Sequence, residues 1–294
     1  MMRQQFVETI ESIFEQDSRL VVLLGDIGVY GFRRAFEKYP KHIYNIGILE
    51  QAMMSLAAGF ACEGLIPVIH SIAPFIVERS LEQIKIDFGY QRLGGNFVSV
   101  GGSYDYAALG CTHQCPGDVG ILKNVPGIQI VVPGHSKEFD KLFLQSYANG
   151  SPTYFRLSER DNSLANNVEF GKAAILKRGS KATVIAVGPV LDKVVSACAD
   201  IDVTILYYTS VRPFDGETLI HNRASSKILI CEPYYSGALD YDVIKSIGPN
   251  SFRIKHVGVP HKFLTEYGSV KEHDHYVGLT PQNIRLNLEN LINE

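Results

Sequence analysis

Short apolar runs alternate with helix-like segments along the chain, and this alternation constrains the fold more than any other feature. Leu20–Leu24 is apolar throughout, as expected of a strand buried on both faces of a sheet. Residues 3–16 precede it and place Phe6, Ile10 and Ile13 at helical spacing. Strands that alternate with helices indicate a parallel sheet covered by helices on both faces. We therefore predict an α/β protein.

A polar stretch at residues 159–167 divides the alternation into two series, and 294 residues suit two domains. We predict two doubly wound domains, residues 1–162 with a parallel sheet and the smaller 163–294. In the first domain, further strands are expected at 42–46, 66–69, 96–100, 128–132 and 153–157, and helices at 32–38, 55–63, 75–90, 119–122 and 136–147. In the second, strands are expected at 182–187, 203–206, 227–231 and 252–257, and helices at 191–199, 236–247 and 281–292.

Composition and charge argue against several classes of function. The net charge is −3 with scattered Lys and Arg, so we expect no nucleic-acid partner. No apolar run reaches about 18 residues, so we expect no membrane span. The first residues lack the apolar core of a signal peptide. The cysteines show no disulfide-framework spacing, which indicates a reducing compartment and predicts a cytoplasmic protein.

A single acid, Glu50, stands in the otherwise apolar stretch Gly47–Met54. It follows the predicted strand 42–46 and opens a helix. Burial among aliphatic side chains disfavours a charged carboxylate, so a raised pKa is expected, as at many catalytic acids. Position alone favours a plainer interpretation, in which Glu50 interacts with the positive end of the helix dipole.

Three segments are expected to converge at one edge of the first sheet, because each follows a predicted strand. They are 47–51, 71–75 and the long polar loop 101–117. The loop carries His113, whose side chain suits proton transfer near neutral pH, although loop hydrogen bonds alone could also explain it. Cys111 and Cys115 flank this histidine; a Cys–His nucleophile stays open, but no local signature supports it, and we predict no metal ligands.

Several motifs that occur in one order resemble the transketolase family. In the first region they are Gly47-Ile48-Leu49-Glu50-Gln51-Ala52-Met53, Arg79-Ser80-Leu81-Glu82-Gln83-Ile84 and Gly110-Cys111-Thr112-His113-Gln114. In the second they are Val211-Arg212-Pro213-Phe214-Asp215 and Cys231-Glu232-Pro233. The resemblance covers essentially the whole chain and is to the family's pyrimidine-binding and C-terminal domains.

The resemblance also implies a partner. The family's diphosphate-binding domain carries a Gly-Asp-Gly signature and an Asn pair, whereas this chain has Gly25-Asp26-Ile27 and no such pair. The chain therefore looks like the C-terminal half of a split transketolase, which transfers a two-carbon ketol unit between sugars. The implied cofactor is thiamine diphosphate, with Mg²⁺ held mainly by an N-terminal, diphosphate-binding subunit. The expected assembly is an α2β2 heterotetramer.

The resemblance assigns roles to individual residues of the cofactor site. Glu50 matches the family glutamate that hydrogen-bonds N1′ of the pyrimidine ring and so promotes removal of the proton from carbon 2 of the thiazolium. The usual stacking position falls on Ile72, which we expect to be an apolar wall. Phe75 matches a second family aromatic, and we expect it to line the pyrimidine pocket. The segment from Phe75 to Arg79 is one residue longer than in the family.

The substrate site departs from the family pattern. His113 matches a histidine that contacts the sugar, but Leu109 replaces an aspartate, and a further substrate histidine, which aligns near Gly101, is absent. The family's phosphate-binding arginine is displaced, so Arg156 and Arg160 are candidates for a shifted anion contact, with ordinary ion pairs as the alternative. These departures predict a modified sugar, for example a deoxy, amino or nucleotide-linked one.

Three rival interpretations remain at this stage. The chain could be the β subunit of a 2-oxo acid dehydrogenase, which has the same layout and glutamate, or half of a deoxyxylulose phosphate synthase. It could also be a non-catalytic partner subunit. The Thr112-His113-Gln114 run favours transketolase over the dehydrogenase. Retention of Glu50 in an apolar stretch argues against an inactive scaffold.

Overall fold

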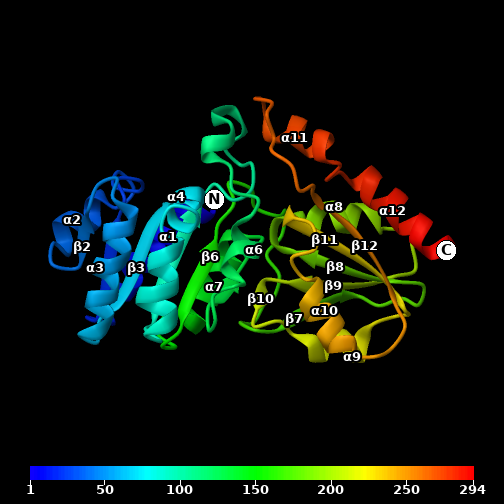
Figure 1. The fold of residues 1–294 in the computed structure, drawn as a ribbon, viewed down its shortest axis with the longest axis horizontal. Helices are drawn as coiled ribbons and strands as arrows, with labels where there is room; N and C mark the ends of the chain where they lie inside the picture. Colours follow the sequence, from blue (N-terminus) through cyan, green and yellow to red (C-terminus); the bar gives the residue numbers. More distant parts are fainter.

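The computed structural model describes residues 1–294 and shows two α/β domains lying side by side (Figure 1). The first domain runs from blue to green in Figure 1, and the second from yellow-green to red. Each domain has its own sheet, as the alternation of strands and helices predicts.

The first sheet has seven strands in the order β10-β5-β6-β4-β3-β1-β2. Its strands are β1 (Leu20–Leu24), β2 (Ile43–Asn45), β3 (Ile66–Ile72), β4 (Gly95–Val100), β5 (Gln129–Val131), β6 (Pro152–Arg156) and β10 (Ser210–Arg212). All neighbours pair in parallel except β10, which runs antiparallel to β5. Because β10 follows the polar stretch in sequence, the second region supplies an edge strand to the first sheet.

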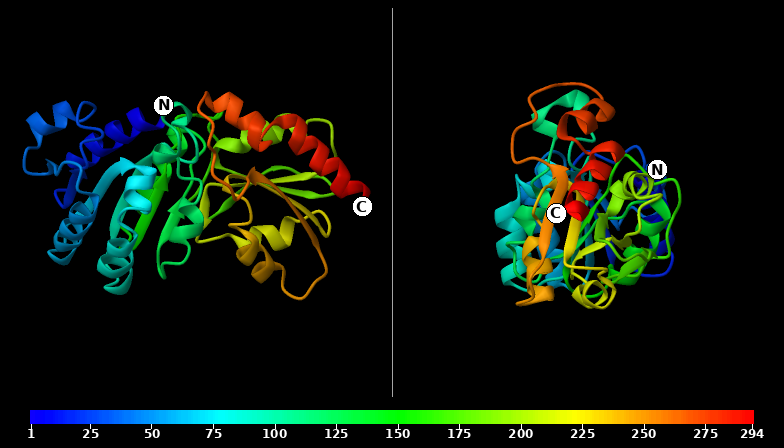
Figure 2. Two further views of the ribbon diagram at one scale, coloured as in Figure 1. Left: turned by 45° about the horizontal axis from the view of Figure 1, so that its top comes forward. Right: turned by 90° about the vertical axis from the view of Figure 1, so that its right-hand side faces the viewer.

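Helices cover both faces of the first sheet, as Figure 2 shows. They are α1 (Met2–Phe14), α2 (Arg33–Lys38), α3 (Glu50–Cys62), α4 (Ala73–Val77), α5 (Leu81–Gln83), the π-helix η1 (Ile84–Tyr90), the 3₁₀ turns η2 (Ala107–Leu109) and η3 (Cys111–His113), α6 (Asp118–Leu122) and α7 (Ser136–Ser146). Successive residues of β1 point to opposite faces. Val22 and Leu24 pack in the same cluster as α1 and α7, whereas Leu23 packs in the cluster of α3.

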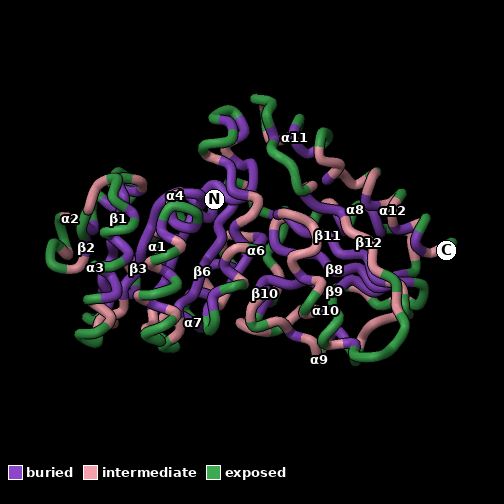
Figure 3. Tube along the Cα trace, in the orientation of Figure 1, coloured by how far each residue is buried: buried purple, intermediate pink, exposed green.

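The second sheet has five strands in the order β12-β11-β8-β9-β7, all parallel except β7, which is antiparallel to β9. Its strands are β7 (Ala173–Lys177), β8 (Thr183–Val187), β9 (Thr204–Tyr208), β11 (Lys227–Tyr235) and β12 (Arg253–Val259). Its helices are η4 (Gly188–Val190), α8 (Leu191–Ala197), α9 (Gly216–Asn222), α10 (Asp240–Ile247), α11 (Val270–Val277) and α12 (Pro281–Asn293). The central strands of both sheets are buried, as Figure 3 shows, whereas β7 has no buried residue.

The segment 75–90 is not the single helix that its apolar spacing predicts. It is divided into α4, α5 and η1. The backbone N–H of Arg79 donates to the carbonyl of Pro74, five residues back, at 3.1 Å. A turn of this kind is wider than an α-helical turn, and such wide turns are frequent at functional sites. Four further elements, all in the second region, are not predicted by the sequence pattern: β7, β10, α9 and α11.

None of the helices combines the length and the apolar character needed to cross a membrane. The cysteines Cys62, Cys111, Cys115, Cys198 and Cys231 are all free thiols.

Candidate active site

Segments that follow β2, β3 and β4 meet at the carboxyl-end edge of the first sheet. Glu50 begins α3 at this edge and accepts a hydrogen bond from Ser71 at the end of β3. The ring of Phe75 contacts that of His113 in the long loop. The predicted convergence of 47–51, 71–75 and 101–117 is therefore confirmed.

The carboxyl group of Glu50 is buried, with 1% of its side chain exposed. Its Oε1 accepts a hydrogen bond from Ser71 Oγ at 3.1 Å, and its Oε2 lies 2.5 Å from a terminal nitrogen of Arg79. Met53 and Met54 are buried beside it, as expected, but Ile48 and Leu49 are exposed. The setting of this acid is therefore more polar than the apolar stretch alone indicates, because a hydroxyl and a cation contact it.

An aromatic ring lies next to this acid. Phe75, on α4, is half-buried, and its ring centroid lies 5.4 Å from that of His113, edge to face. The guanidinium of Arg79 lies over the same ring, 4.2 Å from its centroid. Ile72 is buried at the end of β3, where it can form an apolar wall. The structure thus places Glu50, Phe75 and His113 around one region of the sheet edge.

The turn η3 positions His113. Gly110 precedes it with a φ of 74°, a left-handed conformation that glycine adopts without strain. A Cβ at Gly110 would lie 2.7 Å from the ring of Tyr267, so this loop packs closely against the segment before α11. The Nδ1 of His113 lies 2.9 Å from the hydroxyl of Thr112. The half-buried imidazole can exchange protons with a bound molecule at this edge.

Arg156 does not reach the sheet edge as a free anion-binding group. Its side chain is 1% exposed, and its Nε donates to the carboxylate of Asp118 at 2.7 Å. The same carboxylate accepts a hydrogen bond from the hydroxyl of Tyr154 at 2.9 Å. The Arg156 guanidinium also lies over the ring of Tyr234, on β11 of the second domain. Arg156 is therefore a buried cation between the domains, and these contacts favour the ion-pair alternative over a substrate contact.

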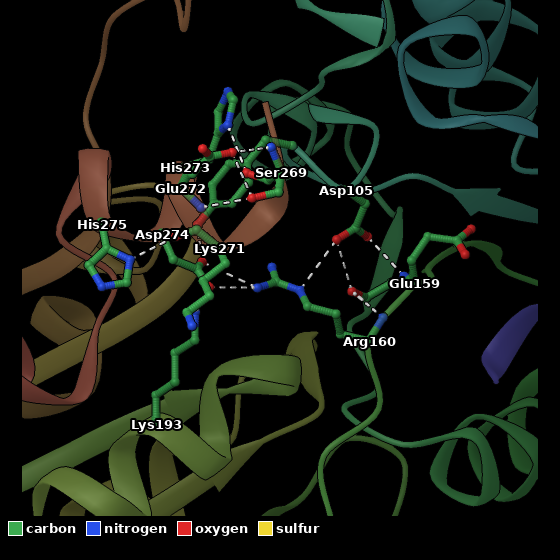
Figure 4. A network of polar contacts seen from close by, with 12 residues as sticks. Asp105, Glu159, Arg160, Lys193, Ser269, Lys271, Glu272, His273, Asp274 and His275 are labelled. Atoms are coloured by element: carbon green, nitrogen blue, oxygen red, sulfur yellow. Dashed lines mark hydrogen bonds and ion pairs between the residues drawn. The ribbon is translucent and has the colours of Figure 1, made fainter. Parts of the chain in front are cut away.

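Arg160 is likewise held by carboxylates, in the network that Figure 4 shows. Its guanidinium lies 3.5 Å from Asp105 and 3.1 Å from Asp274 on α11. Lys193 on α8 also pairs with Asp274, at 2.6 Å. Tyr104 donates its hydroxyl to Asp274 at 2.7 Å. Arg160 therefore links the long loop to the second domain, and its prediction as a substrate contact is not supported by these contacts.

Burial shifts the pKa values within this network. It raises the pKa of Asp105, and the nearby Arg160 partly opposes the effect. It lowers the pKa of Lys193 for the same reason, since desolvation disfavours the charged form of either group. The network is thus a set of partly desolvated charges that balance one another between the domains.

The structure shows the surroundings of two positions that differ from the family pattern, Gly101 and Leu109. A Cβ at Gly101 would lie 2.3 Å from the ring of Tyr106, so a histidine does not fit unless that ring moves. Leu109 is exposed at the end of η2, just before the turn that carries His113. An apolar side chain near this histidine offers no hydrogen bond to a sugar hydroxyl.

The thiol of Cys115 is not a nucleophile poised beside His113. It is buried, and it donates a hydrogen bond to a carboxylate oxygen of Glu78 at 3.5 Å. Burial raises its pKa well above the ordinary value, and reactive cysteines need the thiolate. Cys111 is an exposed free thiol. No group of three or more His, Cys, Asp or Glu side chains is arranged to hold a metal ion.

The sequence analysis missed two residues of this site, Ser71 and Arg79. Ser71 ends the strand that precedes Phe75, so its place at the sheet edge could have been read from the strand assignment. Arg79 lies four residues after Phe75, a spacing that brings side chains to one face of a helical turn. The spacing of Phe75 and Arg79 is visible in the sequence. The pairing of Arg79 with Glu50 is not, because it depends on the packing of two elements that lie 29 residues apart.

Comparisons with known proteins agree with this geometry. The family model "Transketolase, pyrimidine binding domain" matches residues 1–163, and "Transketolase, C-terminal domain" matches residues 171–284. A protein described as "Uncharacterized 33.6 kDa protein in fasciation locus" from Rhodococcoides fascians is 37% identical over 283 residues, covering 95% of this chain and 91% of that protein. The 6-deoxy-6-sulfo-D-fructose transketolase subunit SqwH of Clostridium sp. (strain MSTE9) is 27% identical over 300 residues. That match covers 96% of this chain and 92% of the related subunit.

A solved structure described as "Split gene transketolase, inactive beta4 tetramer" has the same fold. Its TM-score is 0.87 at 21% identity, and the match covers 99% of this chain and 98% of that chain. At that identity the likeness concerns the fold alone.

Proposed function

Because the chain belongs to the transketolase family, we propose that it is one subunit of a split, thiamine-diphosphate-dependent transketolase. In this role it transfers a two-carbon ketol unit between sugars together with a diphosphate-binding subunit. The observation that carries the proposal is the buried carboxylate of Glu50 beside the ring of Phe75, at the sheet edge of a pyrimidine-binding domain.

The residues present fit the pyrimidine end of the cofactor. A flat guanidinium already lies over the Phe75 ring and pairs with Glu50, so the space between them accepts a planar, hydrogen-bonding group. We assign Phe75 to the face of the ring, Ile72 to an apolar wall, and Glu50 to its ring nitrogen. When bound, thiamine diphosphate supplies a site that stabilises a carbanion.

The protein's own contribution is to hold and move protons. With the cofactor bound, the Glu50 carboxyl would share a proton with a nitrogen of the pyrimidine ring, and Ser71 fixes Oε1 of that carboxyl by donating to it. His113 packs edge to face against Phe75, and its imidazole can exchange a proton with a sugar hydroxyl. We leave Arg156 and Arg160 out of the substrate site, because buried carboxylates hold both guanidinium groups.

We assign Mg²⁺ and the diphosphate to the partner subunit. The residues of this chain offer no cluster of ligands for the ion. Large apolar side chains are exposed on the two residues before α3, on α3 itself and on η1, and they support a protein–protein contact there. They are Ile48, Leu49, Leu56, Ile86 and Tyr90. We propose that the assembly is an α2β2 heterotetramer. We also propose a cytoplasmic location, consistent with the free cysteines.

We propose that the sugar is a modified one. The loop near His113 presents Leu109, and the backbone at Gly101 has no room for a histidine, so two polar contacts expected for an ordinary sugar phosphate are absent. The related subunit from Clostridium sp. is named for 6-deoxy-6-sulfo-D-fructose. That name supports a substrate of the same general class.

The test is reconstitution. The chain is purified alone and together with a subunit that carries the diphosphate-binding domain, and both are assayed with thiamine diphosphate and Mg²⁺. We expect the chain alone to be inert and the complex to transfer two-carbon units from 6-deoxy-6-sulfo-D-fructose or another modified ketose. Full activity of the chain alone would contradict the split enzyme.

Decarboxylation of a 2-oxo acid with loading of a lipoyl domain would identify a dehydrogenase instead. Clear preference for xylulose 5-phosphate and ribose 5-phosphate would contradict the modified sugar.

A further inference from the structure

The side chain of Arg79 fills the space between Phe75 and Glu50. Its guanidinium carbon lies 4.2 Å from the centroid of the Phe75 ring, and one of its terminal nitrogens lies 2.5 Å from Glu50 Oε2. The arginine is 36% exposed, whereas the acid is 1% exposed. A solvent-accessible cation thus covers a buried carboxylate.

The backbone explains how Arg79 reaches this position. Both Glu78 and Arg79 donate backbone hydrogen bonds to the carbonyl of Pro74, at 2.9 and 3.1 Å. This wide turn follows α4 and lies within the segment from Phe75 to Arg79, which the resemblance implies is one residue longer than in the family. Arg79 then lies four residues after Phe75, on the same side of the turn. The stacking follows from that spacing.

The geometry of Arg79 matches what a pyrimidine ring requires. A guanidinium is planar, stacks on aromatic faces, and donates to carboxylates from its edge. A pyrimidine ring bound between the same two residues would also lie flat on Phe75 and turn a nitrogen toward Glu50. Two planar groups cannot occupy one face of Phe75 and one oxygen of Glu50 at the same time.

We propose that Arg79 is a placeholder: in the cofactor-free subunit its guanidinium occupies the pyrimidine position between Phe75 and Glu50, and the cofactor must displace it. The proposal rests on the proposed function, because it takes the ring to be that of thiamine diphosphate. Its chemical basis is that a buried carboxylate with a single hydroxyl partner, Ser71, is costly to leave without a counter-charge.

Displacement is feasible because Arg79 has solvent on one side. Its long side chain can rotate outward and keep its charge hydrated, which a fully buried arginine cannot do. Arg79 therefore acts as a competitor that weakens cofactor binding, and its removal should strengthen binding.

The first experiment uses the cofactor-free full chain. Unfolding by urea is measured for the wild type, Arg79→Ala, Glu50→Gln and the double variant. The placeholder contact predicts non-additivity: Arg79→Ala destabilises the chain when Glu50 is present and has little effect in the Glu50→Gln background. Additive effects would overturn the pairing.

The second experiment measures thiamine diphosphate binding to the assembled complex by isothermal titration calorimetry. We expect Arg79→Ala to bind the cofactor about tenfold more tightly than wild type, since a partly exposed pair no longer has to be broken. Arg79→Gln provides a second variant with a side chain closer in length, and it should shift affinity in the same direction. Arg19→Ala is the matched control, because it breaks the exposed ion pair with Asp17 at the other end of β1.

The outcomes separate the two proposals. If the wild-type complex binds no thiamine diphosphate, the proposed function fails and the placeholder role with it. If the wild-type complex binds the cofactor but both Arg79 variants bind it equally or more weakly, the placeholder role fails and the proposed function stands. Weaker binding would mean that Arg79 holds the cofactor rather than competing with it.

Discussion

Two of the acid–arginine pairs in the first domain, Asp118–Arg156 and Glu50–Arg79, differ in their access to water. Asp118 and Arg156 are 0% and 1% exposed, and their contact is surrounded by Tyr154 and by the second domain. Glu50 is equally buried, but Arg79, its partner, is 36% exposed. Each pair joins one carboxylate and one guanidinium, so the difference lies in the surroundings rather than in the chemistry of the groups.

The difference indicates two separate uses of the same pair. Breaking a fully buried pair leaves an uncompensated charge that cannot reach water, so Asp118–Arg156 is suited to locking the domains together. Glu50–Arg79 can open because the arginine can move into solvent. One pair fixes the architecture, and the other leaves a carboxylate available for a ligand.

Asp118→Asn would break the closed pair and gives the largest expected loss of stability. Arg156 would keep its charge in a buried position without a carboxylate, at a cost of about 3–5 kcal/mol. Urea unfolding of the full chain measures the change. Lys38→Ala is the matched control, because it breaks the exposed pair with Glu15, and it should change stability little. A loss of stability in Asp118→Asn no larger than in Lys38→Ala would contradict the locking role of the Asp118–Arg156 pair.

His70 is a buried titratable group without a counter-charge, in contrast to the two acid–arginine pairs. Burial lowers its pKa from 6.5 to about 4, and its Nδ1 lies 2.8 Å from the carbonyl oxygen of Val98. The unfolded chain therefore takes up the proton first as the pH falls, and stability decreases between pH 6.5 and 4. From these two pKa values, the loss contributed by His70 between about pH 7.5 and 5 is about 2 kcal/mol.

The measurement is the free energy of unfolding at several pH values for the wild type and His70→Gln. The variant should lose this part of the pH dependence, because glutamine does not titrate. An unchanged slope in the variant would show that other groups cause the acid sensitivity. Phe6 packs against the imidazole, so the stability of the variant at neutral pH serves as the reference.

The local pattern of apolar residues was sufficient to predict most of the strands and helices. Leu20–Leu24 is apolar at every position, and it is the fully buried strand that such a run predicts. The strand β10 was missed because it is short and pairs with β5 across the polar stretch at 159–167. The helix expected at 75–90 is interrupted by wide turns. These turns are set by backbone hydrogen bonds and do not change the spacing of the apolar residues, so that spacing does not reveal them.

The candidate site was predictable where a residue lies at the end of a strand, and less so where its partner lies far away in sequence. Glu50, Phe75 and His113 follow predicted strands, and the structure brings them to one edge. Arg156 looked available for an anion because its partner, Asp118, is 38 residues away. The same limit hid the contact of Arg79 with Glu50, which joins elements 29 residues apart.

The most direct test of the central claim follows the proton on carbon 2 of thiamine diphosphate bound to the assembled complex. Its exchange with deuterated solvent is measured by quenched-flow NMR for the wild type, Glu50→Gln, and Glu63→Gln, an exposed control at the other end of α3. We expect Glu50→Gln to bind the cofactor and slow exchange by about 10²–10⁴-fold, the usual contribution of a positioned acid–base group, while the control matches the wild type. Exchange in Glu50→Gln as fast as in the wild type would contradict the catalytic role of this carboxylate.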